Sequence, residues 1–232
     1  MLCRGFILAA LLLSLLSGRV TAQTAAPVAP ALCNMTGKDD PVDREAACLS
    51  ELSGRVSRTG ETLTIRLETG KLKTYRNNSK ACENDDAQRC VGYVLLGYHP
   101  QGSVYAIQLS FYEGSGVELL SARSGAILRV SGTPYFTPDG SRFVAIDNDY
   151  VHGEEHDLSI GTAANGKLAM EWQSRRVDES RQWRFERWID NDRVALQVLP
   201  ADSEQKCPVA DCEAFVVRVG KRGAVRPSPL PW

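Results

Sequence analysis

The stretch YFTPDGSRFVAIDN at residues 135–148, followed by GTAANGKLAM at residues 161–170, decides the fold of this 232-residue chain. Pro138 presets φ at the second position of a turn, and the Asp139 side chain can bond the backbone beside it. Gly140 suits the positive φ that closes such a turn. Strand-like runs flank the turn, and the second segment carries an Asn-Gly pair, so each segment predicts a β-hairpin.

The same pattern recurs along the chain, which is the mark of internal repeats. The segments YHPQGSVYAIQLSF (98–111) and SARSGAILRV (121–130) align with the first stretch turn upon turn. A degenerate unit is RWIDNDRVALQVL (187–199) with AFVVRVGKRGAV (214–225), and a partial one is TLTIRLETGKLKTY (62–75). Each unit contains an aromatic-led turn, two or three predicted strands and a Gly-containing hairpin.

Within these units apolar and polar residues alternate, which is typical of half-buried strands. The sets expected to share a sheet face are Leu63, Ile65 and Leu67; Tyr105, Ile107, Leu109 and Phe111; Leu168, Met170 and Trp172; Val194, Leu196 and Val198; and Phe215, Val217 and Val219. We expect the β structure to begin at Thr62. Residues 33–60 are polar, with one short helix predicted near 43–52 between Pro41 and Gly54.

At FTPDGSRFVAI and the Gly-Lys-Leu hairpin after it, the chain resembles the Pro-Asp-Gly repeat of exported bacterial β-propellers. These include the propeller of the Tol-Pal translocation system and related WD-like repeats. The likeness is good over 134–173, fair over 92–133 and poor elsewhere. It implies a mostly β fold, an antiparallel meander of propeller-like blades. About four units of about 40 residues fit, so a small closed propeller and an open stack of sheets both stay open.

The N-terminus predicts export. Arg4 precedes an uncharged apolar run of about 14 residues, and small residues end at Ala22, so residues 1–22 form a predicted signal peptide. The alternative, a membrane anchor, needs about 20 apolar residues. We expect a flexible tether at 23–32, a single β domain at 33–226 and a Pro-rich tail at 227–232. No membrane span is expected after cleavage, and the predicted location is periplasmic or secreted.

Charge argues against one class of partner. Of the 27 Lys and Arg residues, Arg4 and Arg19 leave with the signal peptide, so 25 remain against 28 Asp and Glu. A mature net charge of 25 − 28 = −3 gives no electrostatic reason for non-specific nucleic-acid binding.

Cysteine usage also favours export. After Cys3 is removed, six cysteines remain, and an even number in an exported chain predicts disulfides. The simplest pairing joins neighbours in sequence: Cys33–Cys48, Cys82–Cys90 and Cys207–Cys212. The alternative is a zinc site, but none of the spacings is the Cys-x-x-Cys of zinc ribbons.

The string His152-Gly153-Glu154-Glu155-His156 matches the His-x-x-Glu-His pattern of inverted zinc proteases. That chemistry needs a helix to bring both imidazoles to one face, and Gly153 disfavours a helix here. An exposed acidic loop between two strands is the preferred interpretation. Calcium-like binding within 147–157 is a further alternative, because Asp and Glu supply hard oxygen ligands.

A second cluster alternates arginine with aromatic residues. In a strand, Trp183, Phe185 and Arg187 would share one face, while Arg184 and Trp188 would share the other. Guanidinium groups beside aromatic faces suit an anion- or glycan-binding surface. The preferred interpretation is a strand whose tryptophans pack into the core beneath arginine stems. The binding-surface candidates are therefore Trp183, Arg184, Arg187 and Trp188.

No Gly-x-Ser-x-Gly, Walker-type or Gly-x-Gly-x-x-Gly motif occurs in the sequence, so no catalytic set and no cofactor is predicted. The function predicted from sequence is a non-enzymatic exported protein that binds another envelope protein or a glycan; an inhibitor or immunity-type protein is one version. The alternative is a metal-dependent hydrolase that uses the His152–His156 loop.

Overall fold

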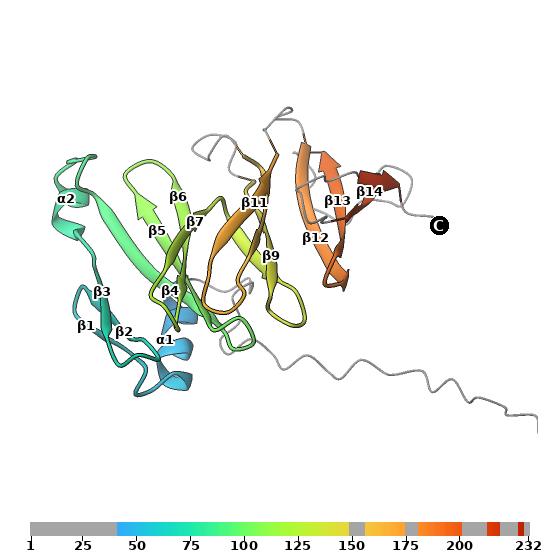
Figure 1. Cartoon of the computed structure of the whole chain (residues 1–232). Coiled ribbons are helices and arrows are strands. Elements are labelled where there is room, and N and C mark those ends of the chain that lie inside the picture. The colour runs from blue at the N-terminus through green and yellow to red at the C-terminus, as the bar shows by residue number, and fades with distance from the viewer. Residues whose placement is uncertain (1–40, 149–155, 175–180, 201–212, 219–226, 230–232) are drawn as a thin grey trace, which may run out of the picture.

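The computed structural model describes residues 41–148, 156–174, 181–200, 213–218 and 227–229 (Figure 1). The predicted signal peptide and tether lie outside these ranges, as do Cys33, Cys207, Cys212 and His152.

The described chain forms four antiparallel sheets, each a meander of strands consecutive in sequence. The first sheet contains β1 (Val56–Thr59), β2 (Thr62–Arg66) and β3 (Leu72–Arg76). The second contains β4 (Val91–His99), β5 (Val104–Phe111), β6 (Ser115–Ser121) and β7 (Ile127–Val130). The third contains β8 (Thr133–Phe136), β9 (Arg142–Ile146), β10 (Leu158–Thr162) and β11 (Ala169–Gln173). The fourth contains β12 (Arg181–Asp190), β13 (Arg193–Pro200), β14 (Glu213–Arg218) and β15 (Pro227–Pro229).

These sheets stand side by side as propeller-like blades. Figure 1 shows them in chain order, with β1–β3 at one end of the row and β14 at the other, so the described blades form an open stack in this view. The predicted fold class, mostly β with antiparallel propeller-like units, is confirmed. None of the described helices is long and apolar enough to cross a membrane.

Three apolar cores lie between the four blades. In β5, Tyr105 and Ile107 belong to the core shared with the first sheet, while Ala106 belongs to the core shared with the third sheet. In β9, Phe143 packs toward the second sheet and Val144 toward the fourth. The two inner sheets are therefore buried on both faces, and Ala106, expected opposite the buried face, is 0% exposed.

The first blade begins earlier than expected. β1 starts at Val56, whereas the sequence predicted β structure only from Thr62 onward. Val56 is the one apolar residue in this strand, so the period-two signal is absent. Pairing with β2, from Val56 opposite Ile65 to Thr59 opposite Thr62, forms the strand nevertheless.

Helix α1 (Pro41–Glu51) lies close to its predicted position and packs against β4 and β1, at the core between the first and second blades. Cys48 and Leu52 join the first core. Glu45, only 7% exposed, accepts hydrogen bonds from Arg58 Nε at 2.6 Å and Arg58 Nη2 at 2.8 Å. It also accepts one from the Leu95 backbone N–H at 2.7 Å. One carboxylate thereby ties α1 to strands of two blades.

A β-bulge in β11 makes one predicted sheet face wrong. Leu168, Met170 and Trp172 were expected to point the same way, but pairing of β10 with β11 shifts between Ile160, opposite Trp172, and Gly161, opposite Met170. The extra residue turns the strand, so Leu168 and Met170 pack in the second core and Trp172 in the third.

The cysteines give a mixed outcome. Cys82, in the short helix α2 (Ser79–Glu83), and Cys90 form the predicted disulfide, with Cα atoms 4.5 Å apart. Cys48 is buried and has no disulfide partner among the described residues, and its Sγ donates to the Leu96 carbonyl at 3.7 Å. Because Cys33 lies outside the described residues, the Cys33–Cys48 pair stays a prediction, as does Cys207–Cys212.

The C-terminal segment also differs from the expected tail. Pro227–Pro229 pairs with β14 as strand β15, from Phe215 opposite Pro229 to Val217 opposite Pro227. This part of the predicted tail therefore belongs to the fourth blade. Proline is tolerated there because an edge strand has a side that needs no ladder hydrogen bonds.

Candidate functional site

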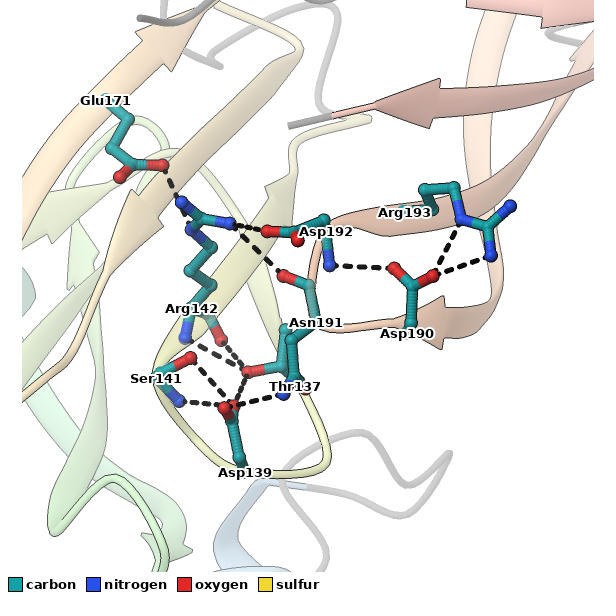
Figure 2. Close-up of polar contacts among 9 residues, drawn as sticks. All are labelled: Thr137, Asp139, Ser141, Arg142, Glu171, Asp190, Asn191, Asp192 and Arg193. Atoms are coloured by element: carbon teal, nitrogen blue, oxygen red, sulfur yellow. Dashed lines mark hydrogen bonds and ion pairs between the residues drawn. The ribbon is translucent and has the colours of Figure 1, made fainter. Parts of the chain in front are cut away.

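The Pro-Asp-Gly turn connects β8 and β9 as the sequence predicted. The Gly140 N–H donates to the Thr137 carbonyl at 2.8 Å, and Gly140 has φ of +69°. Asp139 Oδ1 accepts from Ser141 N at 2.9 Å and from Thr137 Oγ1 at 2.7 Å (Figure 2). Burial alone would raise the pKa of Asp139, but these hydrogen bonds hold that pKa below its ordinary value. The carboxylate acts as a brace for the turn.

The same turn contacts the equivalent turn of the fourth blade. Asp139 Oδ2 accepts a hydrogen bond from Asn191 Nδ2 at 2.7 Å. Arg142 lies 3.5 Å from Glu171 Oε2 through its Nε and forms an ion pair with Asp192 through Nη1 (Figure 2). Because Asn191 and Asp192 of the fourth blade bind Asp139 and Arg142 of the third, we interpret this network as a joint between the two blades.

On its other side the turn packs against the equivalent turn of the second blade. A Cβ placed on Gly140 would lie 2.3 Å from Gly102 N, so the two turns touch backbone to backbone. The His99 ring stacks on Phe136, with centroids 4.5 Å apart, and His99 Nδ1 accepts from the Gly102 N–H at 3.2 Å. The aligned turns of blades two, three and four therefore form a continuous contact.

His99 gives this joint a pH dependence. Burial lowers its pKa from 6.5 to about 4, and the charge of Asp139 opposes that shift only in part. The unfolded chain takes up a proton near pH 6.5 and the folded chain does not, so stability present above pH 6.5 is lost as the pH falls toward 4. At about 1.4 kcal/mol per pKa unit, we expect His99 to account for a loss of about 2–3 kcal/mol between pH 7 and pH 4.

Urea denaturation at a series of pH values checks this expectation. The His99→Gln variant should lose most of the slope of stability against pH in this window. The His156→Gln variant leaves the buried ring in place and should keep that slope. Equal slopes in wild type and His99→Gln would refute the assignment.

The predicted arginine and tryptophan cluster lies on β12, and its two kinds of side chain lie on different faces. Trp183 and Trp188 both pack in the third core, and Trp188 Nε1 donates to the Tyr135 carbonyl at 3.1 Å. The prediction that Trp188 shares a face with Arg184 is wrong, because register shifts after Phe185 and so turns Trp188 toward the core.

The two arginines of this cluster lie on the opposite face. Arg184 donates to Gln197 Oε1, and Arg187 lies 3.8 Å from Glu186. The tryptophans therefore pack inward, as in the preferred interpretation of the sequence. The cluster does not present aromatic faces beside free guanidinium groups. Whether the arginine face binds a ligand stays a prediction.

The acidic loop at 147–157 is described only at its two ends. Asp157 Oδ2 accepts from Trp183 Nε1 at 3.1 Å, and its Oδ1 accepts from Ser174 Oγ. Asp157 is thus held by neutral donors from β12 and from Ser174, the residue that follows β11. No group of three or more His, Cys, Asp or Glu suited to a metal occurs among the residues that the structure describes. His152, Glu154 and Glu155 lie outside them, so the metal-binding alternative stays a prediction.

A surface that the sequence did not single out lies at the tip of the β5–β6 hairpin. Phe111 and Tyr112 are 41% and 45% exposed, although Phe111 was expected on a buried face. The Phe111 N–H donates to the Gly114 carbonyl at 3.0 Å and closes the hairpin. Tyr112 OH donates to Asp85 Oδ1 at 3.1 Å, which raises the pKa of Tyr112. The tip is thereby fixed to the loop of the Cys82–Cys90 disulfide.

We call this surface the aromatic corner: Phe111, Tyr112, Glu113 and the disulfide loop 82–90. The loop is internally held, because the Cys90 N–H donates to the Asp86 carbonyl at 2.9 Å and Arg89 Nε to Asp86 Oδ2 at 2.7 Å. Four carboxylates belong to the corner or its loop, at Glu83, Asp85, Asp86 and Glu113. Two exposed rings are therefore presented on a rigid and mostly acidic base.

No protein-family model matches this chain, and no curated protein matches its sequence. Among solved structures, TolB from Acinetobacter baumannii is 15% identical with a TM-score of 0.32, over 76% of this chain and 40% of that chain. An oligogalacturonate lyase in complex with manganese is 14% identical with a TM-score of 0.31, over 56% of this chain and 37% of that chain. This chain spans about two fifths of the length of each.

Proposed function

We propose that this chain is an exported, periplasmic, non-enzymatic binding protein that docks a basic segment of another envelope protein on the aromatic corner. The observation that carries the proposal is the exposure of Phe111 and Tyr112 on a tip anchored to a disulfide loop. An inhibitor of an enzyme in the same compartment is one version of this role.

The chemistry of the corner favours a partner rich in lysine or arginine. Cations lie over aromatic rings at a gain of about 0.5–1 kcal/mol on exposed surfaces. Carboxylates at the rim steer and orient a basic segment. Because the hairpin and the disulfide loop are already ordered, little conformational freedom is lost on docking. Tyrosine and phenylalanine are also enriched in the centres of protein interfaces.

Export is supported by two independent features. The N-terminal segment has the charge, apolar run and small residues of a signal peptide. The Cys82–Cys90 disulfide is of the kind that persists in an oxidising compartment.

Affinity capture tests the role. Mature protein purified from the periplasm of its own host is immobilised, and envelope extract is passed over it at low salt. We expect one stoichiometric protein with a Lys- or Arg-rich exposed segment. The Phe111→Ser/Tyr112→Ser double variant should capture less than about a tenth as much of this protein as wild type does. The variant loses two cation–aromatic contacts and the apolar area buried with them, which together contribute more than about 1.4 kcal/mol to binding.

The matched control is Ile127→Ser on β7. Ile127 is also 41% exposed, but it pairs with Leu120 at the end of β6 that is remote from the β5–β6 hairpin tip. Capture by this variant should equal that of wild type, and raised salt should weaken both. The proposed function would be refuted if wild type captured no partner, or captured no more of it than the double variant does.

A further inference from the structure

The outer face of the first blade carries a shallow depression that the docking role leaves unused. Its volume is about 210 Å³, and it is lined by Gly54, Arg55, Val56, Ser57, Thr64, Arg66 and Leu72. Alternation along the strands places Val56 and Ile65 toward the first core, so their neighbours Ser57, Thr64 and Arg66 face outward.

Two arginines lie directly across from each other at the edge of this depression. The register that pairs Val56 with Ile65 and Ser57 with Thr64 continues to Arg55 and Arg66. The Arg66 N–H donates to the Arg55 carbonyl at 2.7 Å, which fixes the two backbones side by side. Both side chains line the same depression, so two positive charges share one small surface.

These guanidinium groups differ from several other arginines of the chain. Arg58 pairs with Glu45, Arg123 with Glu68 and Arg193 with Asp190. No ion pair or side-chain hydrogen bond joins Arg55 or Arg66 to another residue in the part of the chain that the structure describes. Like charges directly opposite on a sheet destabilise it, and a bound anion would remove that repulsion.

The other residues that line the depression indicate which class of anion it suits. Arginine pairs bind carboxylates and phosphates through forked hydrogen bonds. Ser57 and Thr64, opposite each other on β1 and β2, offer hydroxyl groups that both donate and accept. Leu72, paired with Arg66 and 58% exposed, supplies an apolar wall. A ring with one anionic group, several hydroxyl groups and an apolar face complements the two arginines, the two hydroxyl side chains and the apolar wall.

We propose that this depression binds an anionic saccharide, with its carboxylate held by Arg55 and Arg66, its hydroxyls by Ser57 and Thr64, and its ring against Leu72. None of these residues belongs to the aromatic corner. The saccharide site and the protein-docking role therefore stand or fall separately.

Nitrogen–proton correlation spectra of the whole mature protein test the site with three probes in phosphate-free buffer: glucuronic acid, glucose and inorganic phosphate. We expect glucuronic acid to give saturable shifts confined to the backbone amides of 54–57, 64–66 and 72. Glucose should give no saturable shift there. Phosphate should bind at least about tenfold more weakly than glucuronic acid, because it makes fewer hydrogen bonds and no contact with the apolar wall.

Variants assign the contacts. Arg55→Gln and Arg66→Gln should each weaken the binding of glucuronic acid by at least about tenfold, since each removes a charged hydrogen bond. Arg76→Gln is the matched control, because Arg76 is an exposed arginine of the same sheet that does not line the depression. Glucuronic acid should also raise the melting temperature of wild type and Arg76→Gln, but not of Arg66→Gln.

Three results would overturn the proposal. The first is the absence of localised shifts with glucuronic acid. The second is unchanged affinity in both Arg55→Gln and Arg66→Gln. The third is equal affinity for phosphate and glucuronic acid, which would indicate an anion site without specificity for a saccharide.

Discussion

A Glu45→Ala variant is expected to unfold with a free energy about 3–5 kcal/mol lower than that of wild type. Glu45 is nearly buried and accepts three hydrogen bonds, two from Arg58 and one from the Leu95 backbone. Removing the carboxylate leaves a guanidinium and an amide N–H without that acceptor in a site shielded from water. The loss of such a partner costs more than the intact pair contributes, because the remaining charge stays desolvated.

Urea denaturation of the disulfide-intact protein measures the loss. The Glu61→Ala variant is the matched control, since Glu61 is exposed in the turn between β1 and β2, and it should change stability by less than about 0.5 kcal/mol. A Glu45→Leu/Arg58→Met double variant should recover part of the loss, because the stranded charge is gone as well. A loss below about 1 kcal/mol for Glu45→Ala would show that water reaches the pair.

The sequence predicted the blades because turn chemistry and strand period agree along the chain. At Pro138-Asp139-Gly140 each residue type has a role that the structure confirms: Asp139 braces the turn and Gly140 adopts φ of +69°. The runs at 105–109 and 194–196 lie in buried strands. Local rules of this kind act within a few residues, so they are visible without knowledge of tertiary contacts.

The faces of individual strands were harder to predict. Trp172 and Trp188 each follow a bulge that inserts one residue and reverses the alternation. No residue type marks these bulges in the sequence. A single slip exchanges every later side chain between the two faces, and this is why the face expected for the arginine and tryptophan cluster was wrong.

Both candidate surfaces also escaped prediction, for a different reason. Tyr112 and Asp85 are far apart in sequence, and only the disulfide loop and the hairpin tip bring them to 3.1 Å. Arg55 and Arg66 become neighbours only through the pairing of β1, a strand with no alternating pattern of its own. Sites assembled by long-range register leave no compact motif in the sequence.

The joint between blades is the remaining test of the fold. We expect Gly140→Ala to lower the free energy of unfolding by about 2–5 kcal/mol. An alanine at φ of +69° costs about 1–2 kcal/mol on backbone grounds alone. Its Cβ would also lie 2.3 Å from Gly102 N and 2.7 Å from the Gln101 carbonyl carbon, so the turns of the second and third blades must separate. Forcing atoms into a packed contact adds about 1–3 kcal/mol.

Gly70→Ala separates these two contributions. Gly70 has φ of +81°, and a Cβ there meets no atom within 4 Å. It should therefore show the backbone cost of about 1–2 kcal/mol and nothing more. If denaturation of both variants gives the same loss, the turns do not press together and the blades are joined chiefly by their apolar cores. A larger loss for Gly140→Ala means that the Pro-Asp-Gly turn aligns one blade on the next, which explains why glycine ends both aligned turn triplets.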